Sequence, residues 1–342
     1  MRALIFRCIV SAVAMLIVVS CDSAQRGVVP SGVSASTLVR VLPDKRGNVK
    51  LYKDTFGDPS PDGITAGPDG AVWFTDPGND VIGRITTKGT YTLQQPASVE
   101  LSGGLITGPD NALYFTAAQS NAQIGKITTD GTVTLFADPN GSFPQGITVG
   151  PDGALWFAES NGTVGRMDTS GTVTHVTVAA SNAELEGIVS GPDGRLWVTE
   201  YVVGGSRFAN KVIRLATSGK YKTFTVGSGP QIICVGPDKA LWFTETGAGA
   251  IGRLTTGGKY KEFSTGQKYS VPFGIATGPD GALWFTDPGI YSIGRMTTKG
   301  KVTFYAVPGS YPALAKIAAG PDGRMWFTNF LAPPAVGRIT VR

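Results

Sequence analysis

The 342-residue sequence has little of the chemistry on which most enzymes depend, since it contains three cysteines and a single histidine, His175. No nucleophile, base and orienting residue stand together in a known pattern, and no phosphate-binding loop is present. The formal net charge is +5, and it falls to +3 (28 Lys and Arg against 25 Asp and Glu) without Arg2 and Arg7 of the N-terminal segment. This charge is too small and too dispersed to indicate a nucleic-acid partner.

A long hydrophobic run is also missing, because the apolar stretch at residues 8–19 is too short to cross a membrane comfortably. It follows two arginines and ends in Val-Val-Ser-Cys at residues 18–21, which resembles the bacterial lipobox. We therefore expect a lipoprotein signal peptide at residues 1–20 and a diacylglycerol on Cys21. An ordinary cleaved signal and an uncleaved anchor are the alternatives.

Residues 21–46 are rich in Ser, Val and Gly and are interpreted as a lipid anchor and tether. The expected location is the cell envelope, with the protein exported and held on a membrane that faces the periplasm or the exterior. Cys234 is then the only thiol of the folded part, so no intramolecular disulfide can form.

Glycine, by contrast, is abundant, and the tripeptide Gly-Pro-Asp recurs at intervals of 41 to 45 residues. Its seven copies begin at Gly67, Gly108, Gly150, Gly191, Gly236, Gly278 and Gly320. This period is typical of one four-stranded blade per repeat. The sequence therefore predicts an all-β, seven-bladed β-propeller over residues 47–342.

The sixth repeat serves as the template for a blade. A short inner strand leads into the Gly-Pro-Asp-Gly turn, and the second strand carries Trp284, which is large enough to pack between blades. The third strand contains Gly294-Arg295, and the basic residue is interpreted as a hydrogen-bonding group between blades.

The last repeat is incomplete, because only two residues follow its third strand. Residues 45–52 match the outermost strand of the sixth repeat, residues 298–305. We therefore expect an N-terminal outer strand to complete the last blade and close the ring.

Antiparallel connectivity places the regular turns on one face, here called the turn face. The blade-to-blade connections and the second-to-third-strand loops lie on the other, the linker face, which varies more and is the expected functional face. Two sets of positions are predicted to surround a channel mouth there. Inner strands begin at Asp62, Gln145, Glu186, Gln231 and Phe273, and the residues after the Trp-Phe-Thr-like triplets are Asp76, Glu159, Glu200, Glu245 and Asp287.

An acidic ring of this kind favours a divalent cation, Mg²⁺ or Ca²⁺, or a cationic or hydroxyl-rich ligand. Glu159, Glu200 and Glu245 are candidate bases or metal ligands. Asp76 and Asp287 are also explained by turn formation, because each is followed by Pro-Gly.

An insertion at residues 201–210 falls on the same face. It contains Tyr201 and Arg207, which would cover the mouth as a lid, although a neutral surface insertion remains the alternative. His175 lies in an outermost strand and is expected to be a solvated surface residue.

The repeat Gly-Ile-x-x-Gly-Pro-Asp-Gly-x-Leu-Trp-Phe-Thr-Glu, followed by Ile-Gly-Arg, resembles that of the virginiamycin B lyase family over residues 48–342. The resemblance implies opening of type B streptogramin antibiotics at their ester linkage by elimination, with Mg²⁺. That chemistry needs a base to take a proton and a cation to hold developing negative charge.

The family pattern implies a tyrosine, two histidines and a glutamate at four positions of the mouth, where this chain has Asp62, Phe273, Ala315 and Asn329. We therefore expect a monomeric envelope propeller that binds an unidentified small molecule or envelope protein. The alternatives are a streptogramin-type carbon–oxygen lyase, another metal-assisted enzyme that uses the acidic ring, and an assembly platform.

Overall fold

The computed structural model describes residues 49–53, 59–94, 99–117, 122–139, 142–168, 170–180, 183–201, 210–309, 312–331 and 334–340. The predicted signal peptide, the whole predicted tether with Cys21, and Arg207 lie outside the described residues. Within these ranges, no helix is long and apolar enough to cross a membrane.

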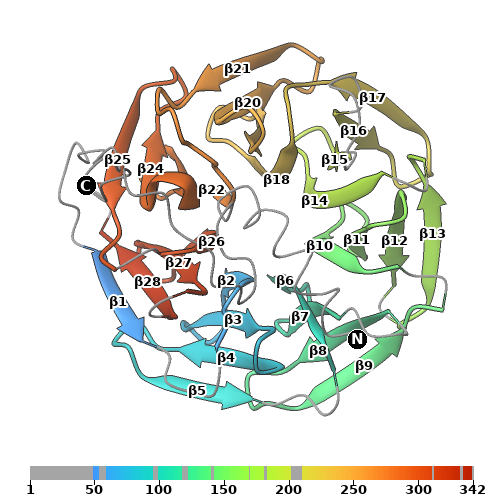
Figure 1. The fold of residues 1–342 in the computed structure, drawn as a ribbon. Helices are drawn as coiled ribbons and strands as arrows, with labels where there is room; N and C mark the ends of the chain where they lie inside the picture. Colours follow the sequence, from blue (N-terminus) through green and yellow to red (C-terminus); the bar gives the residue numbers. More distant parts are fainter. Residues whose placement is uncertain are drawn as a thin grey trace, which may run out of the picture. The chain divides into compact units, whose positions relative to one another are not determined.

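The strands form seven four-stranded antiparallel sheets arranged as blades around an axis (Figure 1). The innermost strands are β2 (Ile64–Ala66), β6 (Leu101–Thr107), β10 (Pro144–Val149), β14 (Glu184–Ser190), β18 (Pro230–Val235), β22 (Ile275–Thr277) and β26 (Leu314–Ala319). The second strands are β3 (Val72–Asp76), β7 (Leu113–Ala117), β11 (Leu155–Glu159), β15 (Leu196–Tyr201), β19 (Leu241–Glu245), β23 (Leu283–Asp287) and β27 (Met325–Asn329).

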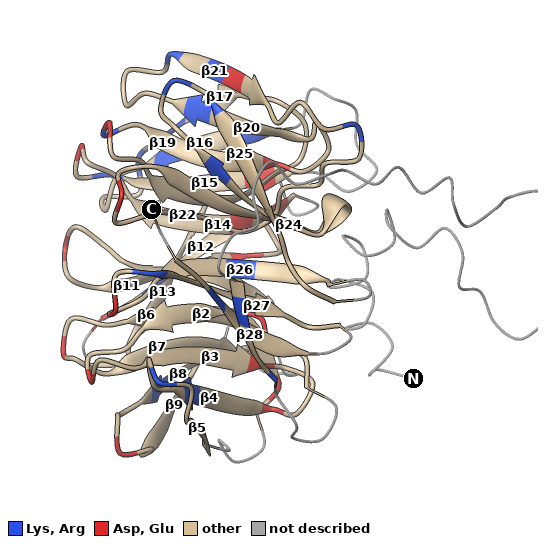
Figure 2. Ribbon diagram, turned by 90° about the vertical axis from the view of Figure 1, so that its left-hand side faces the viewer, with Lys and Arg blue, Asp and Glu red and all other residues tan. Residues whose placement is uncertain are grey.

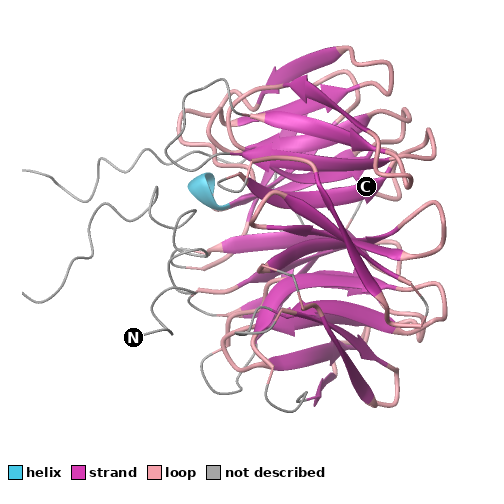
Figure 3. Cartoon of the chain, turned by 90° about the vertical axis from the view of Figure 1, so that its right-hand side faces the viewer, coloured by secondary structure: helices cyan, strands magenta, loops and turns pink. Residues whose placement is uncertain are grey.

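The third strands are β4 (Val81–Ile85), β8 (Gln123–Ile127), β12 (Thr163–Met167), β16 (Lys211–Leu215), β20 (Ala250–Leu254), β24 (Ser292–Met296) and β28 (Ala335–Ile339). The outermost strands are β5 (Tyr91–Gln94), β9 (Val133–Ala137), β13 (Val173–Thr177), β17 (Tyr221–Thr225), β21 (Tyr260–Ser264), β25 (Val302–Ala306) and β1 (Val49–Lys53). The short 3-10 helix η2 (Pro288–Ile290) lies on the linker face, on the side opposite to the regular turns (Figure 3).

The N-terminal strand closes the ring as the sequence predicts. β1 pairs with β28, and Val49 lies opposite Ile339. Tyr52 stacks on Trp326 with ring centroids 5.5 Å apart. The blades are numbered 1 to 7 in the order of their inner strands, from β2 to β26. The pairing of β1 gives blade 7 its fourth strand and removes an exposed sheet edge.

Tryptophans of the second strands fill the space between blades, as expected. Trp156 of blade 3 is fully buried against Leu185 and Leu196 of blade 4. The phenylalanine that follows points to the other side of the sheet and covers the glycine of the third strand. A Cβ atom on Gly294 would lie 2.1 Å from the ring of Phe285, so a side chain there has no space.

The repeated basic residue of the third strand bonds mainly within its own blade, and among the described residues the predicted bond between blades is seen for Arg338, which donates through Nη1 to the Thr87 carbonyl oxygen of blade 1 at 2.8 Å. Arg295 donates through Nε to Asp280 Oδ2 of the turn in its own blade, at 2.6 Å. Asp280 Oδ1 accepts the Trp284 indole N–H at 2.9 Å. The third strand lies beside the second in each sheet, so the aspartate, tryptophan and arginine meet within one blade. Figure 2 shows these acidic turns repeated along one side of the disc.

Candidate functional site

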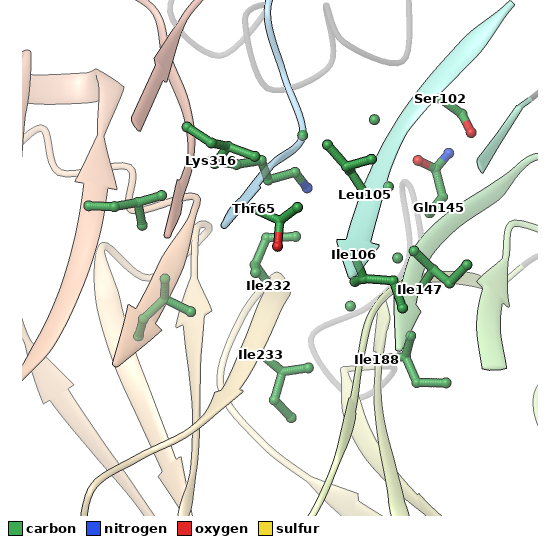
Figure 4. Close-up of a pocket in the computed structure, with 18 residues that line it drawn as sticks. Thr65, Ser102, Leu105, Ile106, Gln145, Ile147, Ile188, Ile232, Ile233 and Lys316 are labelled. Atoms are coloured by element: carbon green, nitrogen blue, oxygen red, sulfur yellow. The ribbon is translucent and has the colours of Figure 1, made fainter. Parts of the chain in front are cut away.

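A cavity of about 270 Å³ occupies the axis of the propeller (Figure 4). Each inner strand contributes at least one aliphatic residue to its lining, in the order Ile64, Leu105, Ile147, Ile188, Ile233, Ile275 and Ile317, and Ile106 and Ile232 line it as well. Such a lining removes apolar surface from water and accepts the apolar part of a ligand. Polar groups lie at one end, where Ser102, Gln145 and Lys316 reach the same space.

Lys316 connects the polar groups at the mouth of this cavity. Its Nζ lies 3.7 Å from Glu186 Oε1 and 4.9 Å from the ring centroid of Phe273. Burial raises the pKa of Asp62 and of Glu186, while the positive charge of Lys316 opposes the rise at both carboxyls. The mouth therefore holds carboxyls from blades 1 and 4 and an ammonium group from blade 7.

The position of Asp62 depends on a glycine of the next blade. Gly103 has φ +89°, and a Cβ atom built on it would lie 2.0 Å from Asp62 Oδ2. A side chain at residue 103 would therefore displace the carboxylate, in addition to the strain of the left-handed backbone.

Tyr201 adds an aromatic ring and a hydroxyl on the blade 4 side. Its hydroxyl donates to Glu184 Oε2 at the start of β14, and burial raises its pKa. Gln231 is buried nearby at the start of β18. The structure therefore places Tyr201, Glu186 and Gln231 in neighbouring blades at one side of the mouth.

Irregular strand pairing directs several of these side chains toward the mouth of the cavity. The register shifts by one residue at the start of β10, β14, β18 and β26, and Gln145, Glu186, Gln231 and Lys316 lie within those shifts. Extra residues of this kind bend a strand and redirect its side chains. Lys316 was missed because the sequence comparison aligned Ala315 with the mouth, whereas Ala315 is buried.

Threonines of the second strands fix the backbone of the mouth. Five of them donate their hydroxyl to a carbonyl at the start of the next blade's inner strand. The five described bonds are Thr116 to Gln145, Thr199 to Gln231, Thr244 to Phe273, Thr286 to Ala315 and Thr328 to Asp62. Blade 3 has Ala158 at this position, so Glu186 receives no such bond.

The acidic residues after the triplets do not surround the mouth, contrary to the prediction. Asp76, Glu159, Glu200, Glu245 and Asp287 are at most 2% exposed. Four of them accept backbone N–H groups from the blade-to-blade connections. These contacts are Ser60 N to Asp76, Ser142 N to Glu159, Gly227 N to Glu245 and Val271 N to Asp287.

Each of these acids has its own local partners. Glu200 accepts from Lys211 Nζ at 3.0 Å, and Glu245 accepts from the Tyr260 hydroxyl at 2.7 Å. Burial raises the pKa of Glu245 to about 7 and that of Asp287 to about 6. Glu159, Glu200 and Glu245 are thus not brought together, and their predicted catalytic role finds no shared site.

His175 is not a solvated surface residue, so that prediction is wrong. Its side chain is 14% exposed, and its Nε2 lies 2.9 Å from Asp138 Oδ1 and 3.6 Å from Glu159 Oε2. The imidazole turns inward because β13 packs over β12, where Gly165 opposite His175 leaves room.

The Mg²⁺ implied by the resemblance does not fit the mouth well. Asp62 and Glu186 are oxygen ligands of a suitable kind, but the ammonium group of Lys316 already lies beside Glu186. A fixed cation at this distance repels a dication and supplies positive charge in its place.

The fold and the cavity together define a seven-bladed propeller with a ligand-sized site on its axis. The chain belongs to the virginiamycin B lyase family, whose model matches residues 31–209 and 205–342. The resemblance inferred from the repeat is therefore confirmed. No curated protein matches the chain in sequence.

Solved structures of lyases share the fold. A streptogramin B lyase structure is 27% identical, with a TM-score of 0.77, and the match covers 86% of this chain and 97% of the other. Virginiamycin B lyase from Staphylococcus aureus is 29% identical with a TM-score of 0.78, covering 86% and 99% of the two chains. A catalytically inactive histidine-to-alanine variant of that enzyme, solved with quinupristin, gives 29% identity, a TM-score of 0.77 and the same coverage.

Proposed function

We propose that this protein is a binding propeller that takes a small, peptide-like molecule into the mouth of its axial cavity. The arrangement of Asp62, Glu186 and Lys316 above an aliphatic cavity carries this proposal. The cavity accepts an apolar group, and the charged rim holds amide, amino and hydroxyl groups in one orientation.

The similar structures support the proposed ligand class. The Staphylococcus aureus enzyme has been solved with quinupristin, a ligand of that protein. This chain has a different set of side chains at the mouth, with Asp62 and Phe273 at two positions where the family pattern has a tyrosine and a histidine. We therefore propose retained binding of cyclic or linear peptides, without the metal-assisted step of the family.

Calorimetric titration with quinupristin and with linear peptides rich in apolar residues tests the proposal. Lys316→Met is expected to weaken binding about tenfold, because hydrogen bonds to charged groups contribute roughly 1.5–3 kcal/mol. Lys299→Met is the matched control, since Lys299 is exposed in a regular turn. Equal affinities of the two variants, or no binding by the parent chain, would contradict the proposal.

Ring-opening lyase activity is the second candidate. It is favoured by the proximity of Glu186, whose pKa is raised by burial, to the ammonium of Lys316. Glu186 would take a proton from the carbon next to the one that bears the ester oxygen, and the electron pair of that C–H bond would form a carbon–carbon double bond. The carbon–oxygen bond would break with its electron pair going to the leaving carboxylate, whose charge Lys316 would stabilise. Mass spectrometry distinguishes this elimination, which leaves the mass of quinupristin unchanged, from hydrolysis, which adds a water.

We further propose that the chain is exported and anchored through Cys21, on the lipobox-like residues 18–21. Labelling with a radioactive fatty acid should mark the parent chain, and Cys21→Ala should lose the label and leave the membrane fraction. Equal labelling of both chains would contradict the anchor.

A further inference from the structure

Three metal-ligating side chains converge at the junction of blades 2 and 3, outside the axial cavity. Asp138 follows β9, Glu159 ends β11 and His175 lies in the middle of β13. One ligand atom from each lies within 4.8 Å of the others. Each residue comes from a different strand, so folding of the ring assembles the group.

Asp138 is buried with no hydrogen-bond partner for its carboxylate. Its side chain is 0% exposed, and neither Oδ1 nor Oδ2 accepts a hydrogen bond within the described residues. The contact of Oδ1 with His175 Nε2, at 2.9 Å, lacks hydrogen-bond geometry. Leaving a buried carboxylate unsatisfied is costly, so such a group calls for a partner.

The other blades show what this position normally contains. Asp138 N–H donates to the carbonyl just before the neighbouring third strand, and Val178, Val226, Val307 and Thr265 make the same bond in their blades. The ring therefore places a buried valine at three equivalent positions and a buried aspartate here.

His175 departs from the repeat in the same way. The residue opposite the third-strand glycine is aliphatic or aromatic in four blades, where it is Leu51, Leu93, Leu135 or Phe304. Asp138 and His175 thus both replace an apolar residue of the repeat with a metal-ligating one. They lie in different blades but meet at one junction.

A bound dication would neutralise the two carboxylates of this group. Among the described residues, His175 is the only basic side chain within ion-pair range of either carboxylate. A dication together with two carboxylates and a neutral imidazole gives an electrically neutral site.

We propose that Asp138, Glu159 and His175 bind one divalent transition-metal ion, with Zn²⁺ as the representative, which fastens the end of blade 2 to blade 3. One nitrogen and two carboxylate oxygens suit Zn²⁺ or Co²⁺, whereas Mg²⁺ and Ca²⁺ prefer oxygen ligands alone. The site is almost closed to solvent, so its role is structural. It is separate from the proposed ligand site, which lies on the inner strands.

Metal binding to the purified full chain, stripped with a chelator, tests the site directly. We expect one Zn²⁺ per chain by calorimetry and a rise in melting temperature of about 5 °C at a metal concentration near 100 times the dissociation constant. Co²⁺ should give the visible absorption of a tetrahedral site. Mg²⁺ should produce no shift.

Asp138→Val and His175→Leu restore the residue types that the ring uses elsewhere, so both variants are expected to fold. Each should abolish the Zn²⁺ shift and the Co²⁺ absorption, and Asp138→Val should melt at a higher temperature than the metal-free parent. The control Asp168→Asn changes an exposed turn of the same blade and should keep the full response. No stoichiometric binding by the parent, or a response that survives in both site variants, would overturn the proposal.

Discussion

The two faces of the ring treat their buried polar groups in different ways. On the turn face, a blade's turn aspartate meets the aromatic and the basic residue of the same blade, and even blade 2 keeps the arrangement with Tyr114 and Lys126. On the linker face, the acid after the triplet meets a backbone N–H in one blade, a lysine in another and a histidine in a third. Repeated contacts therefore belong to the scaffold, and differences among equivalent positions indicate where this chain has chemistry of its own.

Deletion of residues 49–53 should have the largest effect, because blade 7 depends on a strand from the other end of the chain. The deletion exposes the edge of β28 and removes the Tyr52 side chain, which stacks on Trp326. We expect loss of cooperative thermal unfolding, measured by circular dichroism. An unchanged melting curve would show that repetition alone holds the ring together.

Asp280→Ala tests the turn face within one blade. It leaves the buried Trp284 N–H and the Arg295 guanidinium without their acceptor, and we expect a loss of about 4 kcal/mol in unfolding free energy. Urea denaturation measures the change. The equivalent Asp238→Ala should cost a similar amount, and a large difference between the two would contradict the uniformity of this face.

Glu245→Gln tests the linker face through its pH dependence. The carboxyl titrates near 4.5 when unfolded and at about 7 when folded, because burial disfavours its charged form. The folded state therefore binds more protons between these values, and stability falls as pH rises through this window. The amide should remove that fall and stabilise the chain at pH 8 by at most about 3 kcal/mol.

Urea denaturation at pH 5 and pH 8 measures this effect, with Glu100→Gln as an exposed control. A parent stability that does not change between the two pH values would show that Glu245 stays ionised in the folded chain.

The pair of Lys211 and Glu200 should give the smallest effect. The lysine is 34% exposed while the glutamate is 3% exposed, so solvent screens the interaction. A double-mutant cycle with Lys211→Met and Glu200→Gln should give a coupling energy of about 1 kcal/mol. A coupling energy near zero would show that the salt bridge to Lys211, the only one of Glu200 among the described residues, does not contribute to stability.

The repeat allowed most of the fold to be predicted from the sequence. The Gly-Pro-Asp turn fixes where each second strand begins, and a missing last strand at one end with an unmatched strand at the other predicts ring closure. Turns and strand ends of this kind depend on residues that are close in the sequence, so the spacing of the repeat is sufficient to predict them.

The candidate site was harder to predict, since it depends on the direction in which side chains leave the strands. Glu159 and Asp287 were placed at the correct end of their strands, yet the connection between blades covers them. Ala315 is the equivalent of Gln145, Glu186 and Gln231 in the same register shift, whereas Lys316 lies one position later, where blades 3 and 4 have glycine. Spacing along the chain therefore pointed to Ala315 and not to Lys316.

The threonine that is absent from blade 3 has a consequence for ligand entry. Five junctions of the ring are tied by a hydroxyl from one blade to the first carbonyl of the next, but Ala158 leaves the junction of blades 3 and 4 without this tie. Widening of the mouth at that junction therefore breaks no hydroxyl bond of this kind. Glu186 lies there, so the carboxyl that faces Lys316 is also the one whose backbone can yield to an incoming ligand.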